Sequence, residues 1–338
     1  MDTTLDPRSP ASAQKGVTTP LVSVIVPTHR RPELLRRALQ SVLAQTYPAI
    51  EIHVVENGAR AGAEQVVNEL GGSPRGLFYQ YVPDANVCVA RNDGIRLARG
   101  AYCAFLDDDD EWVPEKLARQ IERLENDPTL GWITCLVWRM ESSTVLEEQP
   151  SYQGSLTLAA LVTAGCFIWT PSCVVVRREC FSTIEMFNPT YRHAADYDLY
   201  LRLARQFAFA VVNEPMVRYH QHAGNMSRSR AGLWRHLLKI TASVKPSADQ
   251  GLTASEIRDV VNRYCRSVYG FASEALARGD YAQAGQHFRT AVRYDPAVGL
   301  KIPWGRIKHP AYRLVRPYVG LLFCRLKTLG RRRTARRQ

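Results

Sequence analysis

Apolar positions along the first 130 residues follow two periods, which alternate along the chain. Short runs rich in β-branched residues, such as "VSVIV" and "IHVV", are separated by segments with an apolar residue every three or four positions. The first pattern is typical of buried strands and the second of amphipathic helices. We therefore expect strands at 21–28, 50–59, 78–83 and 101–106, with helices at 32–45, 64–70, 89–100 and 114–127.

Strands that alternate with helices predict a doubly wound α/β fold with a mostly parallel sheet and flanking helices. The middle third is less regular, with strands expected at 131–140, 172–180 and 208–220 and a helix at 196–206. Beyond Arg228 only helical patterns remain. We place the α/β domain at 21–228 and a helical region at 229–297. One helix pair within 269–296 resembles a tetratricopeptide unit, although a single unit does not make a repeat array.

Positive charge is concentrated at the C-terminal end. The chain has a net charge of +12, and residues 296–338 contain twelve Lys and Arg but no Asp or Glu. Because apolar residues are mixed with these cations, residues 298–338 predict a basic amphipathic tail for an anionic membrane surface. Nucleic-acid binding would need similar charge, but no nucleic-acid motif accompanies it.

The remaining composition bears on location. The first 20 residues lack an apolar signal region, so we expect a disordered leader. No apolar run approaches the roughly 20 residues of a membrane-spanning helix. The eight cysteines form no C-x-x-C pair and lie mostly in apolar runs, as buried free thiols do. We expect a cytoplasmic protein, with peripheral attachment to the inner face of the membrane as an option.

Candidate chemistry lies at the ends of the predicted strands. "PTHRR" follows the first strand, "ENGA" the second and "DDDDE" the fourth, and ligands of such sheets bind at this edge. For Asp107–Asp110 three uses are open: a solvated loop, a divalent-metal site or an aspartate nucleophile. If the segment is extended, Asp107 and Asp109 face one way and Asp108 and Asp110 the other.

Several of these elements together resemble glycosyltransferase family 2, whose members are inverting enzymes of GT-A fold. The resemblance covers about 21–227 and includes P-T-x-x-R, an acidic turn, A-R-N-x-G and F-L-D-x-D-D-x-W, in that order. It implies transfer of a sugar from a nucleotide-diphosphate sugar, with a UDP-sugar expected, to a hydroxyl of a glycan or lipid-linked acceptor. It also implies Mn²⁺ or Mg²⁺ as cofactor and a place in polysaccharide or cell-envelope biosynthesis.

The resemblance implies roles for individual residues as well. An acidic residue after the second strand would recognise the nucleobase, the D-x-D would bind the metal, and a carboxylate at a later helix start would be the general base. On this sequence the base is Asp196, the metal ligands are Asp107, Asp109 and His222, and the donor-binding residues are Pro27, Thr28, Arg30, Glu56, Asn57, Arg91, Asp107 and Asp108.

Other interpretations of these residues and of the chain stay open. Asp196 could serve as a helix cap, His222 as a core histidine and Arg30 as a solvated cation. A dinucleotide-dependent oxidoreductase is disfavoured because no G-x-G-x-x-G follows the first strand. A non-catalytic nucleotide-sugar-binding or scaffold protein, docking a partner through its helical part, is the alternative.

Overall fold

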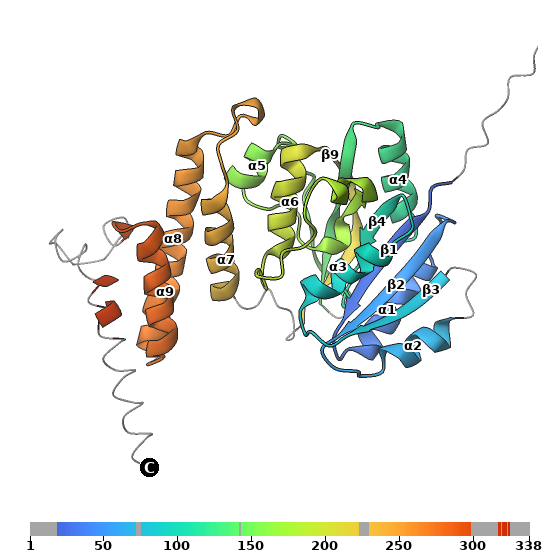
Figure 1. Ribbon diagram of the computed structural model, residues 1–338, viewed down its shortest axis with the longest axis horizontal. Coiled ribbons are helices and arrows are strands. Elements are labelled where there is room, and N and C mark those ends of the chain that lie inside the picture. Colours follow the sequence, from blue (N-terminus) through green and yellow to red (C-terminus); the bar gives the residue numbers. More distant parts are fainter. Residues whose placement is uncertain are drawn as a thin grey trace, which may run out of the picture.

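The computed structural model describes residues 19–71, 76–141, 143–222, 230–298, 317, 318, 320–322 and 324. Within them, one twisted sheet has helices on both faces, and a group of helices stands at one end of the molecule (Figure 1). The predicted leader and most of the predicted basic tail lie outside the described residues. In the part that is described, no helix is both long and apolar enough to cross a membrane.

The first half of the sheet is parallel, in the order β3-β2-β1-β4. Every residue of β1, β2 and β4 is buried because helices cover both faces. The four strands and the helices between them confirm the predicted alternation. Their bounds are β1 Val22–Thr28, α1 Pro32–Leu43, β2 Ile50–Asn57, α2 Ala63–Leu70, β3 Gly76–Val82, α3 Val87–Leu97 and β4 Tyr102–Phe105.

The second half of the sheet is mixed, with the order β4-β8-β6-β9-β5. β8 is antiparallel to β4 and to β6, whereas β9 runs parallel to β6. A short β7 extends β6 as an antiparallel hairpin, and its five residues are all exposed. The bounds are β5 Glu111–Trp112, α4 Lys116–Asn126, β6 Leu130–Glu141, β7 Thr144–Glu148, α5 Leu158–Thr163, β8 Val175–Arg177, α6 Ala195–Gln206 and β9 Ala208–His220, with 3₁₀ turns at Pro171–Cys173 and Arg178–Ser182.

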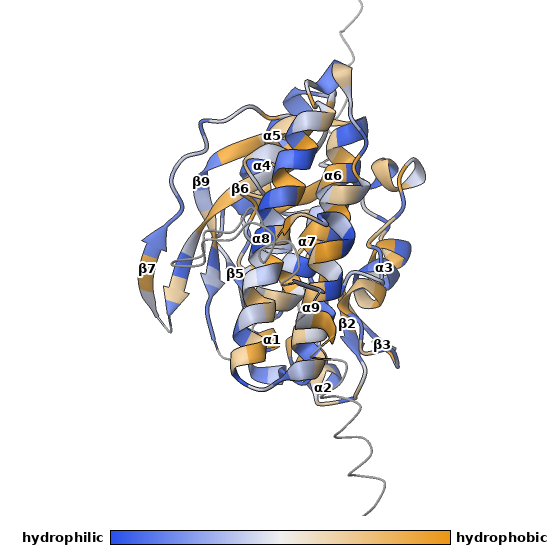
Figure 2. Ribbon diagram, turned by 90° about the vertical axis from the view of Figure 1, so that its left-hand side faces the viewer, coloured by the Kyte–Doolittle hydropathy of each residue, from blue (hydrophilic) through white to orange (hydrophobic). Residues whose placement is uncertain are grey.

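Helices form the end of the molecule opposite the parallel strands. They are α7 Arg230–Ser243, α8 Ala254–Ala277 and α9 Tyr281–Tyr294, with a 3₁₀ turn at Ala248–Gln250. Figure 2 views the molecule from this end, with these helices in front of the sheet. Thr253 and Glu256 form a capping box at the start of α8, and Asp280 caps α9. The buried side chains of α8 and α9 include Ala272, Ala275, Ala284, Phe288 and Ala291, which form the predicted hairpin contact.

A buried carboxylate, Glu51, ties the parallel strands together. This side chain of β2 is 2% exposed. Its Oε1 accepts hydrogen bonds from Ser23 Oγ at 2.6 Å and from the backbone N–H of Arg99 at 2.7 Å. Arg99 Nε also donates to Oε2 at 2.8 Å. Burial alone would raise the pKa of Glu51, but the donors from Ser23, Arg99 and His53 outweigh it and lower the pKa to about 2.

We predict that Glu51→Gln lowers the free energy of unfolding at pH 7 by about 2 kcal/mol, because charge-assisted hydrogen bonds to a buried carboxylate are lost. The folded pKa near 2 lies below the ordinary value of 4.5. The stabilisation is therefore present above about pH 4.5 and disappears as the pH falls toward 2. Urea unfolding of both proteins at pH 7 and pH 3 measures this, and the gap should narrow at pH 3. The exposed Glu64→Gln is the matched control; a Glu51→Gln cost no larger than that control contradicts the prediction.

Candidate active site

The acidic run forms a turn rather than a continuation of the strand. β4 ends at Phe105, and the N–H of Asp110 donates to the carbonyl of Asp107 at 3.1 Å. The side chains therefore do not alternate as they would on an extended segment. Asp108 and Asp109 are bound by the same guanidinium, that of Arg31. The expected division into Asp107 with Asp109 and Asp108 with Asp110 is wrong for this reason.

Asp108 and Asp109 meet donors from β1 and from the loop that follows it. Thr28 Oγ1 donates to Asp108 Oδ2 at 2.8 Å. Arg31 Nη1 lies 3.1 Å from Asp108 Oδ1 and 2.7 Å from Asp109 Oδ2. Burial and the neighbouring charge of Asp109 raise the pKa of Asp108 to about 6, although Arg31 and Thr28 oppose the rise. The predicted donor residue Thr28 thus supports the acidic turn directly.

Asp110 and Asp107 are bound from the other side of the turn. Asp110 is 1% exposed, and its Oδ2 accepts from Thr170 Oγ1 at 2.8 Å and from Ser172 Oγ at 2.6 Å. Burial, followed by the charges of Asp109 and Asp107, raises the pKa of Asp110 well above its ordinary value. Thr170 and Ser172 were not predicted from the sequence, because they lie about sixty residues further along in no recognisable motif.

The segment after the turn is anchored in the core. Trp112 is 2% exposed, and its indole N–H donates to the carbonyl of Ser172 at 2.8 Å. Glu111 Oε1 lies 2.7 Å from His220 Nε2 and 3.0 Å from Arg37 Nε. β5 thereby attaches the acidic turn to β9, which brings the end of β9 to the site.

His222, just beyond β9, completes the group of possible metal ligands. Its Nε2 lies 2.9 Å from Asp109 Oδ2. Two adjacent ligands of an octahedral ion, each about 2.1 Å from it, stand about 3 Å apart, so this pair fits a divalent metal. Across the described residues, no three His, Cys, Asp or Glu side chains gather in a ligand set. A metal at this site would have few protein ligands, and its remaining coordination positions would be open to phosphate oxygens.

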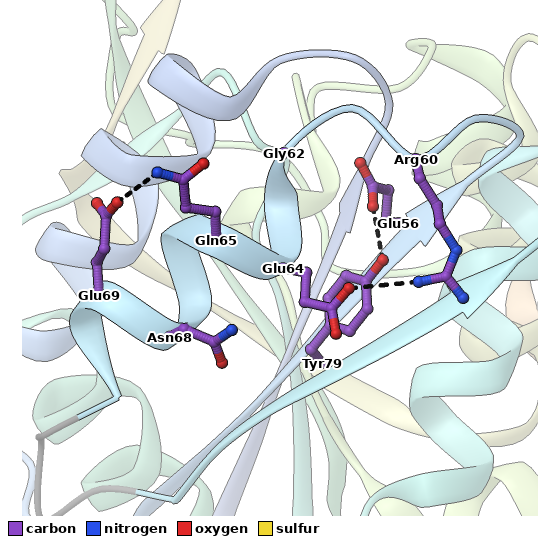
Figure 3. A pocket seen from close by; sticks show the side chains of 8 residues that line it. All are labelled: Glu56, Arg60, Gly62, Glu64, Gln65, Asn68, Glu69 and Tyr79. Atoms are coloured by element: carbon purple, nitrogen blue, oxygen red, sulfur yellow. Dashed lines mark hydrogen bonds and ion pairs between the residues drawn. The ribbon is translucent and has the colours of Figure 1, made fainter.

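Glu56, the penultimate residue of β2, lies beside an open pocket of about 620 Å³ between α2 and β3 (Figure 3). Its carboxylate is 1% exposed and already has three donors within the chain. The backbone N–H groups of Ala61 and Ala63 reach Oε1 at 2.6 and 3.5 Å, and the Tyr79 hydroxyl reaches Oε2 at 2.7 Å. Glu56 therefore holds its loop in place, and nucleobase recognition by it stays a prediction.

Asn57, the next residue, connects β2 to the loop after β1. With its amide oriented to suit both neighbours, it donates to the carbonyl of Thr28 at 2.6 Å and accepts from the N–H of Asn86 at 3.2 Å. Pro27 lies within β1, next to Val55 of β2. Arg30 is exposed and has a positive φ of 56°, a conformation that non-glycine residues rarely adopt.

Arg91 of α3 links the acidic turn to the other half of the site. Its Nη2 lies 2.5 Å from Asp107 Oδ1, and the guanidinium is 5.1 Å above the ring of Phe187. Burial opposes the charge of Arg91, but Asp107 outweighs burial and raises its pKa. The neighbouring Asn92 exchanges two hydrogen bonds with the backbone of Phe187, at 2.8 and 2.9 Å. The A-R-N segment thus fixes the loop that leads to Asp196.

Asp196 lies in the first turn of α6, where the helix dipole favours a negative charge. Its Oδ1 accepts from the N–H of Tyr197 at 2.9 Å. Burial raises the pKa of Asp196, while the nearby charge of Arg91 partly opposes the rise. Ala194, immediately before the helix, has φ of 64°. In the described residues, Ala194 and Arg30 are the two non-glycine positions with positive φ, and both adjoin predicted site residues.

Comparisons with known proteins identify the family and the fold. Residues 23–184 match the sequence profile described as Glycosyl transferase family 2. The amylovoran biosynthesis glycosyltransferase AmsB of Erwinia amylovora is 32% identical over 211 residues, which are 59% of this chain and 69% of AmsB.

Two solved structures share the fold. S. aureus TarS 1–349, in complex with UDP-GlcNAc, matches this chain with a TM-score of 0.62 at 15% identity. The match covers 89% of this chain and 89% of the TarS chain. The mannosyltransferase PcManGT of Pyrobaculum calidifontis, with GDP-Man and Mn²⁺, has a TM-score of 0.53 at 16% identity, over 93% of this chain and 88% of its own. The chain therefore has the GT-A fold and belongs to glycosyltransferase family 2.

Proposed function

We propose that this glycosyltransferase moves a sugar, with inversion and with a divalent metal, from a nucleotide-diphosphate sugar to a hydroxyl of a glycan or lipid-linked acceptor. The observation that carries the proposal is the placement of Arg91 between two acidic groups. Arg91 is paired with Asp107 of the acidic turn and acts electrostatically on Asp196. The buried guanidinium of Arg91 therefore links the acidic turn, where the donor phosphates would bind, to the candidate base Asp196.

The donor side of the proposal rests on the acidic turn. Asp109 and His222 would hold Mn²⁺ or Mg²⁺, which when bound would neutralise the charge of the departing diphosphate. The expected third ligand, Asp107, is paired with Arg91 and does not gather with these two residues. One of the two solved structures is a complex with UDP-GlcNAc and the other a complex with GDP-Man and Mn²⁺, and this supports a nucleotide-sugar donor. We propose a UDP-sugar. The relative in amylovoran biosynthesis supports a role in making a polysaccharide.

On the acceptor side, Asp196 would act as the general base. Its Oδ1 is occupied by the N–H of Tyr197, whereas Oδ2 accepts no hydrogen bond from the described residues. Oδ2 is the proposed proton acceptor from the attacking hydroxyl. A carboxylate with a raised pKa takes a proton more readily, and attack on the opposite side from the leaving diphosphate inverts the anomeric centre.

A panel of UDP- and GDP-sugars, assayed with and without Mn²⁺, tests the proposed function. We expect release of the nucleoside diphosphate from at least one UDP-sugar, and we expect a chelator to abolish it. Activity that survives chelation would remove the metal from the proposal. If no donor in the panel releases its nucleoside diphosphate, even with phosphorylated lipid and glycan acceptors supplied, the non-catalytic alternative would be favoured.

Asp196→Asn should reduce transfer by about 10²- to 10⁴-fold, because the amide cannot take the proton of the acceptor hydroxyl. Donor binding, measured by calorimetry, should stay within a few-fold of the wild type, since Asp196 makes no hydrogen bond to the acidic turn. Asp198→Asn in the same helix turn, paired with Arg202 at 2.8 Å, is the control for disturbance of α6. Near-normal turnover by Asp196→Asn would exclude it as the base.

Arg31→Gln should bind Mn²⁺ about tenfold more tightly than the wild type, because Arg31 now occupies the same Asp109 oxygen as the proposed ion. Mn²⁺ titration followed by electron paramagnetic resonance measures this without any turnover. The exposed Arg30→Gln is the matched control, and Asp109→Asn should lose the ion. Unchanged or weaker Mn²⁺ binding by Arg31→Gln would show that the arginine does not compete with a metal.

A further inference from the structure

α7 runs alongside α6 (Figure 1). Basic and aromatic side chains of α7 contact the loop that leads into α6. The loop before Asp196 contributes Tyr191 and His193, and α7 contributes Arg235, His236 and Lys239. We call these five residues the α6–α7 basic cluster. Nothing in the roles assigned above uses them.

Four members of the cluster, Tyr191, His193, His236 and Lys239, are in contact with one another. His236 Nδ1 lies 2.7 Å from the carbonyl oxygen of His193 and 3.1 Å from its backbone nitrogen. The rings of Tyr191 and His236 meet edge to face, with centroids 5.8 Å apart. The ammonium group of Lys239 stands 5.1 Å from the centroid of Tyr191. α7 is thereby attached to the residues that lead directly into Asp196.

The charge of the cluster is not balanced within the described part of the chain. α7 contains no Asp or Glu, and no described carboxylate forms an ion pair with Arg235, His236 or Lys239. The nearby Asp198 is already paired with Arg202 at 2.8 Å. Burial lowers the pKa of His236, and the positive charges of His193, Arg235 and Lys239 lower it further. Cations held this close together repel one another, and a bound anion would relieve that repulsion.

The cluster belongs to elements other than those that hold the acidic turn. The donor residues come from the ends of β1, β2 and β4, and Arg91 stands between them and Asp196. The cluster is built instead from α7 and from the loop at Tyr191, whose carbonyl accepts from Cys88 Sγ at 3.7 Å. An acceptor that approaches Asp196 along α7, with its hydroxyl toward the carboxylate, would pass the cluster.

We infer that the α6–α7 basic cluster binds an anionic group of the acceptor, a phosphate or a carboxylate close to the hydroxyl that is glycosylated. The inference rests on the proposed function and specifies its acceptor class as an acidic glycan or a phosphate-bearing one. Arg235 and Lys239 supply the charge, and the buried ring of Tyr191 holds the Lys239 ammonium group in place. His236 Nε2, which has no hydrogen bond to any described residue, adds a directional contact.

Calorimetry with three probes tests the inference in the presence of UDP and Mn²⁺: an oligogalacturonate, a glycerol phosphate oligomer and a neutral galactan oligomer. The wild type should bind one of the two anionic probes more tightly than the neutral one. The charged probe that binds identifies carboxylate or phosphate as the recognised group. Arg235→Gln combined with Lys239→Gln should weaken that binding by roughly tenfold, because two cations near one anion are lost.

Controls separate this inference from the proposed function. Lys239 is exposed, so Lys239→Gln alone keeps the test valid if Arg235→Gln impairs folding. Arg258→Gln, an exposed cation of α8, should leave every probe unaffected. UDP-sugar binding is measured on the same proteins: its absence in the wild type would count against the proposed function, whatever the anionic probes do. The inference fails if the wild type binds charged and neutral probes equally, or binds none of them. It also fails if the double variant binds the anionic probe as the wild type does, or if the double variant loses UDP binding instead.

Discussion

Four consecutive carboxylates at the end of a central strand have to be neutralised, and the surrounding structure supplies what this requires. Arg31 and Thr28 come from the first strand and its loop, Arg91 from α3, and Thr170 with Ser172 from the turn before β8. Each partner arrives from a different element. The acidic turn therefore fixes the relative positions of both halves of the sheet, and the rest of the site is arranged around it.

The elements near the turn could be predicted because their signals are local. β1, β2 and β4 are buried on both faces and are rich in apolar residues, and α1 and α4 show a clear helical stripe. β5 could not be predicted, since two residues carry no period, and neither could the antiparallel direction of β8, which depends on a long connection. The local pattern of apolar residues therefore predicts a strand or a helix, but not which strands it pairs with in the sheet.

The site shows the same division between local and distant information. Asp107, Asp109 and Asp196 are found by motif, because each occupies a fixed place relative to a strand or helix. The roles of Arg31, Thr170 and Ser172 depend on contacts across the chain, and such residues are common in loops. The expected alternation of the aspartates failed because the chain turns before Asp110. Glu56 is likewise engaged by its own loop, which no spacing could reveal.

Arg31 has a consequence for how the folded protein relates to its proposed metal. In many small metal sites the ligands repel one another without the ion, so that removing the ion unfolds the protein. Here a guanidinium already bridges Asp108 and Asp109, and two hydroxyl groups donate to Oδ2 of Asp110. Binding of the proposed ion would then replace the Arg31 guanidinium by a metal cation, at carboxylates that are already held in position. If the proposed ion binds there, the polypeptide would fold and persist before any ion reaches it, and ion availability would govern turnover without governing the lifetime of the protein.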